Sequence, residues 1–324
     1  MTLQIDQNSY DEFFKGFHIT DCAVRDRNIF YFVLRAIYSG DNAPPEHELK
    51  KRFVQFVQNH PTVKPWGYKQ LNGFGRLKAG ASLMPFPHFV GVSSEGGVFA
   101  FGKGLNEIED DLRSWAEGGP QRGGIRKLRT IEGALYAVGG NRTVLRRDGK
   151  NNWHGFTKEI PSIGDSDQGF EDMDGFSAKD IYCVGGTGNV FHFDGTRWQQ
   201  CAFPSNRYLE SVCCAGDGYV YIGGQSGYVF KGRGEQWKKI HQDNMTLGFT
   251  DMVWHQGKVW CTSDYGLWVI ENDKLVEADV PPEIRACSGN LSVGDGVMLL
   301  AGMFGAAYHD GQQWHMLVNT QTMA

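Results

Sequence analysis

The sequence predicts an all-β fold, a seven-bladed β-propeller in which each blade is a four-stranded antiparallel sheet. Three observations support this prediction. Similar stretches recur about every forty residues along the 324-residue chain. The 43 glycines are typical of a chain with many tight turns, and apolar residues, at 41%, suffice for a large core. The repeats lack the 3.6-residue periodicity of helical solenoids.

The four C-terminal repeats share one order of features, and they begin at Phe170, Leu209, Phe249 and Ser288. An apolar strand and a Gly or Asp turn precede a second strand that ends in a pair of small residues. A third strand and a second turn lead to an outer strand. The outer strands open with a large apolar residue, namely Trp198, Trp237, Leu275 and Trp314. Because one such sheet cannot bury both of its faces alone, radial repetition of the unit predicts a propeller.

Three further repeats precede these. The repeat from Lys127 has the same small-residue pair and an outer strand at Trp153, the stretch from His88 fits the first three strands of a blade, and the opening from Phe17 resembles the repeat from Phe249. We therefore predict one domain over residues 1–324. Its blades are expected at residues 17–71, 84–115, 125–157, 170–202, 209–241, 249–279 and 287–318.

One segment of the first blade, residues 46–60, departs from the strand pattern. It carries apolar residues at helical spacing between two proline-containing stretches, namely Leu49, Phe53, Phe56 and Val57. We expect an amphipathic helix inserted into the first blade. Its apolar stripe either covers the side of that blade or docks a partner.

One stretch resembles a known repeat, namely SAKDIYCVGGTGNVFHFDGTRW from Ser177 to Trp198. It looks like the bacterial propeller pattern S-A-x-D-V-W/Y-x-V-G-x-x-G-x-V-x-H-x-D-G-x-x-W, and it is similar to repeats of kelch-like and photosystem-assembly-factor-like propellers. The match weakens in the other blades. The resemblance implies the propeller fold and little about function, because propellers bind many unlike molecules.

Composition and charge exclude several classes of function. A net charge of −5 argues against nucleic-acid binding. No stretch approaches 18 apolar residues, and the first residues lack the pattern of a secretory signal, so we expect a cytoplasmic protein without membrane contact. The seven cysteines are an odd number and lie mostly in predicted strands, where we expect reduced core thiols. We also expect the protein to be a monomer by itself.

The common catalytic signatures do not occur in the sequence, which lacks HExxH, the P-loop, GxSxG, CxxC and the Rossmann fingerprint. We therefore expect no catalytic residues, no cofactor and no metal. Asp165-x-Asp167-x-Gly169 faintly resembles a calcium loop, but the closing glutamate of an EF-hand does not follow.

A column of residues occupies the same position in the seven predicted inner strands: Asp21, Phe89, Lys127, Asp172, Ser211, Asp251 and Asn290. Inner strands line the central channel of a propeller, so this column predicts a polar ring around the axis. Two interpretations are open. The short polar side chains bond to neighbouring backbone, or they form a site for a cation or a basic side chain at the channel mouth.

The connection from Pro161 to Gly175 concentrates acidic residues, namely Asp165, Asp167, Glu171, Asp172 and Asp174. Such a loop is either solvated surface or the receptor of a basic partner. In a propeller, the outer-to-inner connections share one face with the loops between second and third strands. On this face we predict the partner-binding residues Asp165, Asp167, Glu171, Asp172, Tyr208, Asp264, Tyr265, Met303 and Phe304. Tyr265 and Phe304 could alternatively cover the channel.

Three hypotheses for function follow from this architecture. The first is a non-enzymatic protein-binding propeller, in its most concrete form a cytosolic immunity protein that neutralises a bacterial toxin. A basic toxin domain is the partner that the acidic loop suggests. The second is a hydrolase or lyase that uses the carboxylates of Asp21, Asp172 and Asp251. The third is an assembly factor or scaffold.

Overall fold

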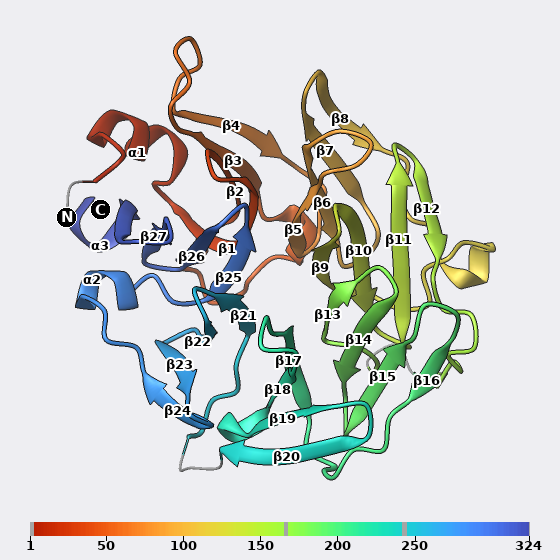
Figure 1. The fold of residues 1–324 in the computed structure, drawn as a ribbon. Coiled ribbons are helices and arrows are strands. Elements are labelled where there is room, and N and C mark those ends of the chain that lie inside the picture. The colour runs from red at the N-terminus through yellow and green to blue at the C-terminus, as the bar shows by residue number, and fades with distance from the viewer. Residues whose placement is uncertain (1–2, 165–167, 242–244, 324) are drawn as a thin grey trace.

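Seven four-stranded antiparallel sheets surround a central axis in the computed structural model (Figure 1). The structure describes residues 3–164, 168–241 and 245–323. Within these residues, each sheet takes its four strands from one continuous stretch of chain. The two ends of the chain lie close together beside the first and last blades (Figure 1). The predicted seven-bladed propeller is confirmed.

The first three blades occupy the N-terminal half of the chain. Blade 1 contains β1 (Phe17–Asp26), β2 (Ile29–Ala36), β3 (Lys51–Val57) and β4 (Trp66–Leu71). Blade 2 contains β5 (Leu77–Ser82), β6 (His88–Ser93), β7 (Val98–Gly102) and β8 (Leu105–Glu109). Blade 3 contains β9 (Ile125–Ile131), β10 (Ala134–Gly139), β11 (Thr143–Gly149) and β12 (Asn152–Gly155).

The other four blades complete the ring. Blade 4 contains β13 (Asp172–Ser177), β14 (Asp180–Gly185), β15 (Asn189–Phe193) and β16 (Trp198–Gln200). Blade 5 contains β17 (Leu209–Cys214), β18 (Val220–Gly224), β19 (Val229–Arg233) and β20 (Gln236–His241). Blade 6 contains β21 (Asp251–His255), β22 (Lys258–Ser263), β23 (Gly266–Glu271) and β24 (Lys274–Glu277). Blade 7 contains β25 (Asn290–Gly294), β26 (Val297–Gly302), β27 (Gly305–His309) and β28 (Trp314–Asn319).

Helices are few and short among the described residues. The α-helices are α1 (Gln7–Phe13), α2 (Pro282–Arg285) and α3 (Thr320–Met323). Single 3₁₀ turns occur at Glu46–Glu48, Trp115–Glu117 and Gln225–Gly227. None of the helices in the described ranges has the length and apolar character that crossing a membrane requires.

The predicted helix over residues 46–60 is wrong. A 3₁₀ turn is followed there by β3, which pairs with β2 on one side and β4 on the other. Phe53 and Val54 are adjacent in β3 and both buried, although successive side chains point to opposite faces of a sheet. Because neighbouring parts of the molecule cover both faces, the strand carries an almost continuous apolar run. Periodicity alone does not distinguish such a strand from a buried helix.

The predicted start of blade 2 is also wrong. The inner strand of this blade is β5, and His88 begins the second strand, β6. The sequence of β5, LKAGAS, has only one large apolar residue, so it lacks the usual signal of a buried strand. In the polar column, Phe89 is therefore replaced by Lys78, which pairs with Val92 of β6.

Large aromatic side chains at the start of outer strands pack against the neighbouring blade. Trp198 of blade 4 is only 5% exposed, and its indole N–H donates to the carbonyl of Phe156, just after blade 3, at 2.8 Å. Trp237 of blade 5 is half-buried and lies edge-on to Tyr182 of blade 4. Each of these tryptophans therefore joins its blade to the preceding one.

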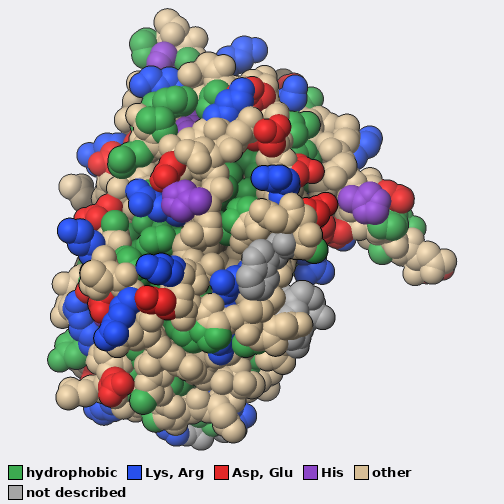
Figure 2. Space-filling model, turned by 90° about the vertical axis from the view of Figure 1, so that its right-hand side faces the viewer, with side chains coloured by type: hydrophobic (Ala, Val, Ile, Leu, Met, Phe, Trp, Pro, Cys, Tyr) green, Lys and Arg blue, Asp and Glu red, His purple; other side chains and the backbone are tan. Residues whose placement is uncertain are grey.

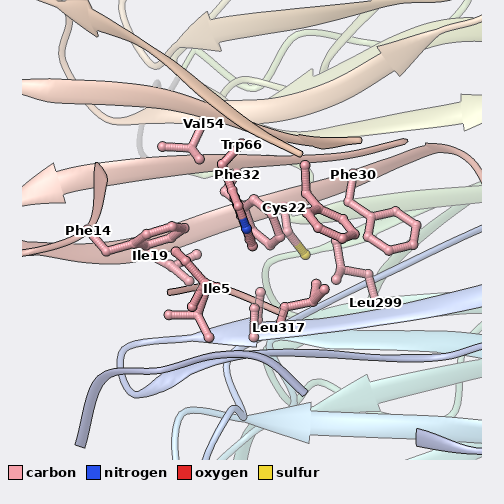
Figure 3. Close-up of a cluster of buried hydrophobic side chains, with 14 of the residues drawn as sticks. Ile5, Phe14, Ile19, Cys22, Phe30, Phe32, Val54, Trp66, Leu299 and Leu317 are labelled. Atoms are coloured by element: carbon pink, nitrogen blue, oxygen red, sulfur yellow. The ribbon is translucent and has the colours of Figure 1, made fainter. Parts of the chain in front are cut away.

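The ring closes through packing between blades 7 and 1. Figure 3 shows this core, in which Phe30 and Phe32 of β2 lie close to Leu299 of β26. The rings of Phe30 and Tyr308 are 4.9 Å apart. The N-terminal segment adds Ile5 to the same cluster, and a backbone hydrogen bond of 3.2 Å joins the N–H of Gln4 to the carbonyl of Met316. The first and last blades are thus held by apolar contact and by the N-terminal segment.

Reducing agent is expected to leave the melting temperature unchanged. All seven cysteines are free thiols in the structure, as predicted; six are buried and Cys214 is half-buried. Burial raises the pKa of Cys183 and of Cys213 well above its ordinary value, which keeps these thiols protonated and unreactive. A thermal melt with and without dithiothreitol tests this expectation, and a fall of several degrees would show that a disulfide stabilises the fold.

Candidate functional site

A cavity of about 760 Å³ opens at one mouth of the central channel. Its wall is built from the starts of inner strands, such as Thr20 and Asn290, and from the loops between second and third strands in blades 6 and 7. The starts of the inner strands and the loops between second and third strands therefore lie on one face of the propeller, as predicted. Six of the predicted partner-binding residues line this cavity: Glu171, Tyr208, Asp264, Tyr265, Met303 and Phe304. Asp165 and Asp167 lie outside the described residues.

The side of the cavity formed by blades 6 and 7 is largely apolar. Tyr265 is 74% exposed and Met303 47% exposed, and each lies at the tip of a loop. Leu247, on the connection into blade 6, is also exposed, and Phe304 is half-buried. Exposed apolar groups that gather around one cavity are typical of a protein-binding surface.

An interacting group of polar side chains lies between the apolar side and the opposite wall. The carboxylate of Glu171 accepts hydrogen bonds from the Tyr208 hydroxyl and from the guanidinium of Arg126. Burial and then the charge of Glu171 raise the pKa of Tyr208 to about 12. Burial and then Glu171 also raise the pKa of the neighbouring Glu210. The negative charge of Glu171 is thus already matched within the protein.

The wall formed by blades 1 to 3 is basic. It contributes five cationic side chains: Arg35, Arg76, Lys78, Arg126 and Lys127. The acidic side chains that line the same cavity are Glu171, Glu210 and Asp264. Among the described residues, cationic side chains therefore outnumber acidic ones at the mouth, whereas Asp165 and Asp167 of the acidic connection lie outside these residues. Arg76 and Lys78, near the rim of the cavity, differ from the other three cations in their pairing.

On one side of the propeller, the described residues show no comparable concentration of one charge. Figure 2 shows the side that carries β8, β12 and β16 in Figure 1, and there acidic and basic side chains are interspersed. Such a mixed surface is typical of solvated protein exterior. The channel mouth is therefore the better candidate for recognition.

Buried ion pairs fill the channel below the mouth. Arg129 donates to both carboxylate oxygens of Asp172, at 2.9 and 2.8 Å, and to Asp251 at 2.6 Å. Lys127 lies 2.7 Å from Asp251. Burial opposes ionisation of Asp251, but Lys127 and Arg129 outweigh it and lower the pKa of this carboxyl. Asp172 is fully buried, so it is not exposed on the face where a partner-binding role was predicted for it.

The carboxylates of the polar column connect the inner strands of adjacent blades. Asp21 accepts the backbone N–H of Ala79 at 3.0 Å, and Asp251 accepts that of Leu291 at 3.1 Å. Asp172 bonds in the same way to the next blade. The interpretation that these side chains bond to neighbouring backbone is confirmed. These bonds and ion pairs occupy the carboxylates that the hydrolase or lyase hypothesis requires.

No group of three or more potential metal ligands occurs in residues 3–164, 168–241 and 245–323. The calcium-like residues Asp165 and Asp167 lie outside these ranges.

The carboxyl of Asp174, which also lies at the channel, predicts a pH dependence of the stability of the protein. Its oxygens accept the backbone N–H groups of Gly175 and Cys214, each at 2.8 Å. Burial raises its pKa from 3.8 to about 6, so the folded protein holds this proton more tightly than the unfolded chain. Stability from this group is therefore greatest below pH 4 and falls as the pH rises to about 6.

Replacing Asp174→Asn should remove this part of the pH dependence, which amounts to a change of up to about 3 kcal/mol in the free energy of unfolding. The measurement is urea unfolding of the wild type and the variant between pH 4 and pH 7. The difference between the two free energies of unfolding should change across this range. A constant difference would contradict the assigned role of Asp174.

The residues of the mouth that sequence reasoning missed include Arg76, Lys78 and Leu247. Arg76 and Lys78 were missed because β5 was not recognised as a strand. Lys78 lies 49 residues before Lys127, which is longer than the forty-residue repeat, so the repeat spacing alone did not place Lys78 in the polar column. Leu247 lies in a connection whose sequence has no repeat counterpart.

A curated relative matches most of the chain. The immune protein Tsi7 of Pseudomonas aeruginosa is 34% identical over 225 residues, which cover 69% of this chain and 73% of the relative. No protein-family model matches the chain.

Solved structures with low sequence identity share the fold. The WD40 β-propeller domain of Doa1 superimposes with a TM-score of 0.59 at 10% identity, over 90% of this chain and 95% of that one. The extracellular domain of BT4673 from B. thetaiotaomicron gives a TM-score of 0.60 at 12% identity, over 91% of this chain and 38% of that one. These likenesses support the propeller fold alone.

Proposed function

This chain belongs to the family of the immune protein Tsi7, and from this membership we propose that it is a non-enzymatic immunity protein that binds and neutralises a bacterial toxin. The family relationship is the observation that carries the proposal. The propeller fold agrees with it, because rigid blades present their loops as a preformed surface for another protein.

The surface that we propose for the toxin is the channel mouth. Its support is the cavity of about 760 Å³ and the exposed side chains Tyr265, Met303 and Leu247 around it. Aromatic and methionine side chains are common anchors of protein interfaces, because they remove much apolar area from water at small entropic cost. A toxin that covered this face would have its own active surface shielded from substrate.

Other properties expected from the sequence belong to this proposal. We propose that the protein acts in the cytoplasm, where it would meet an incoming toxin, and that it is a monomer before the toxin binds. A basic toxin domain stays a prediction, which rests on the acidic connection at residues 161–175. The residues of the channel mouth give no specific support to the hypothesis of an assembly factor or scaffold. They also give none to the resemblance to kelch-like repeats.

The proposal is tested by co-expression in a toxin-sensitive bacterium. A candidate toxin gene, sought among the genes that neighbour the gene for this chain, is induced with and without the chain, and growth is measured. We expect growth to be restored by the chain and the two proteins to purify together. If the chain is produced in folded form but neither restores growth nor binds the toxin, the proposed function is wrong.

A further inference from the structure

Two cationic side chains stand unpaired at the channel mouth. Arg76, just before β5, is exposed, and Lys78 within β5 is half-buried. In the part of the chain that the structure describes, neither side chain makes a hydrogen bond or an ion pair. Both line the mouth cavity and also a second cavity of about 570 Å³ beside it. They therefore lie on the rim that the two cavities share.

The other cations of the same wall already have partners. Arg35 lies 2.8 Å from Glu46, and Arg126 pairs with Glu171. Lys127 lies 2.7 Å from the buried Asp251. Positive charge is thus neutralised along the wall except at Arg76 and Lys78.

The acids near this rim differ in whether another cation already pairs with them. Glu46 pairs with Lys51 as well as with Arg35. Glu95, which also lines the second cavity, accepts the hydroxyl of Ser94 at 2.6 Å. Asp264 lies on the blade 6 side of the mouth. Among the described residues, none of these acids forms an ion pair with Arg76 or Lys78, although the carboxylate of Glu95 lies on the same cavity.

A partner that covers the rim must compensate these charges. A charged side chain removed from water costs free energy unless an opposite charge meets it, and Lys78 is already half-buried. Carboxylates are the matching groups that a protein surface supplies, and arginine can bind a carboxylate through two parallel hydrogen bonds.

We propose that Arg76 and Lys78 form the docking point for an acidic segment of the toxin. This inference rests on the proposed function and adds the chemistry of the partner. The acidic segment occupies the rim between the two cavities, while the apolar surface of the toxin contacts the side with Tyr265 and Met303. The competing outcome is that the toxin presents a basic surface, as predicted from the acidic connection at residues 161–175.

The test measures association of the toxin identified by the co-expression experiment, by surface plasmon resonance at low and high salt. The variant is Arg76→Glu with Lys78→Glu, and the control is Lys69→Glu with Lys179→Glu. Lys69 and Lys179 are exposed and away from the cavity, so the control makes the same change of net charge. We expect the association rate to fall about tenfold at low salt in the rim variant and little in the control.

A variant with Arg76→Gln and Lys78→Gln, checked by thermal melting, separates loss of charge from misfolding and should give a smaller decrease. An unchanged or faster association of the glutamate variant overturns the inference, and a faster one indicates a basic toxin surface. These outcomes leave the proposed function intact, because the toxin still binds.

Fluorescein-labelled hexaglutamate provides a test that does not need the toxin. Fluorescence anisotropy should detect binding to the wild type and to the Lys69→Glu, Lys179→Glu control, and the signal should be lost in the rim variant. Equal binding to all three proteins overturns the inference. Stronger binding of a single-stranded hexanucleotide than of the peptide also overturns it, since it would indicate a nucleic-acid site.

Discussion

Arg129→Met is expected to destabilise the propeller by about 3–5 kcal/mol. The arginine holds the carboxylates of Asp172 and Asp251 together across the channel, and both carboxylates are buried. Methionine fills much of the same volume but leaves Asp172 without its cationic partner. An uncompensated buried carboxylate must then either keep its charge at high cost or take up a proton.

Equilibrium unfolding in guanidinium chloride at pH 7 gives the effect. Arg197→Met is the control, because Arg197 is an exposed residue whose nearest carboxylate, that of Asp194, is 4.0 Å away. We expect less than about 1 kcal/mol for this control. Equal stabilities of the two variants would show that the channel ion pairs contribute little to the fold.

Trp198→Ala is expected to cost about 3–5 kcal/mol, the range for truncation of a buried aromatic side chain. The indole lies between blades 3 and 4, with its ring centroid 5.9 Å from that of Phe156 and 5.4 Å from that of Phe193. The substitution removes these contacts and also the hydrogen bond from the indole N–H to the Phe156 carbonyl. Both losses weaken the junction of two blades.

Trp237→Ala is the matched comparison from the next blade. Its indole N–H bonds within the turn before β20, at the carbonyl of Gly234, and the side chain is only half-buried. We expect a smaller loss, about 2–3 kcal/mol. Unfolding in guanidinium chloride measures both variants, and near-wild-type stability for both would contradict the role of these tryptophans between blades.

The sequence was sufficient to predict the number of blades and the class of fold, because each blade repeats the same order of turns, small residues and outer-strand aromatics. It was insufficient where a strand lacked the usual pattern. In β3 both faces are covered, so Phe53 and Val54 are apolar neighbours and the run resembled a helix. In β5 small residues pack near the channel, and the strand had no hydrophobic signal.

The loop tips of the candidate site could be predicted because their position follows from the repeat. Tyr265 and Phe304 belong to equivalent loops of blades 6 and 7, and both line the mouth. The sequence placed Asp172 both in the inner-strand column and on the partner-binding face. The structure supports the inner-strand position, since Asp172 is the first residue of β13 and its side chain meets Arg129 from another blade. Such a pairing depends on the angle between blades, which spacing along the chain does not specify.

The most direct test of the channel mouth as the binding surface is the dissociation rate of the toxin from Tyr265→Ala and Phe304→Ala variants. Ile108→Ala is the control, since Ile108 is 64% exposed on the outer strand β8 and lies away from the mouth. We expect each mouth variant to release the toxin about tenfold faster or more, as the loss of an anchor side chain does, with little change in association. Unchanged dissociation in both mouth variants, or faster dissociation only in the Ile108 control, would contradict the account.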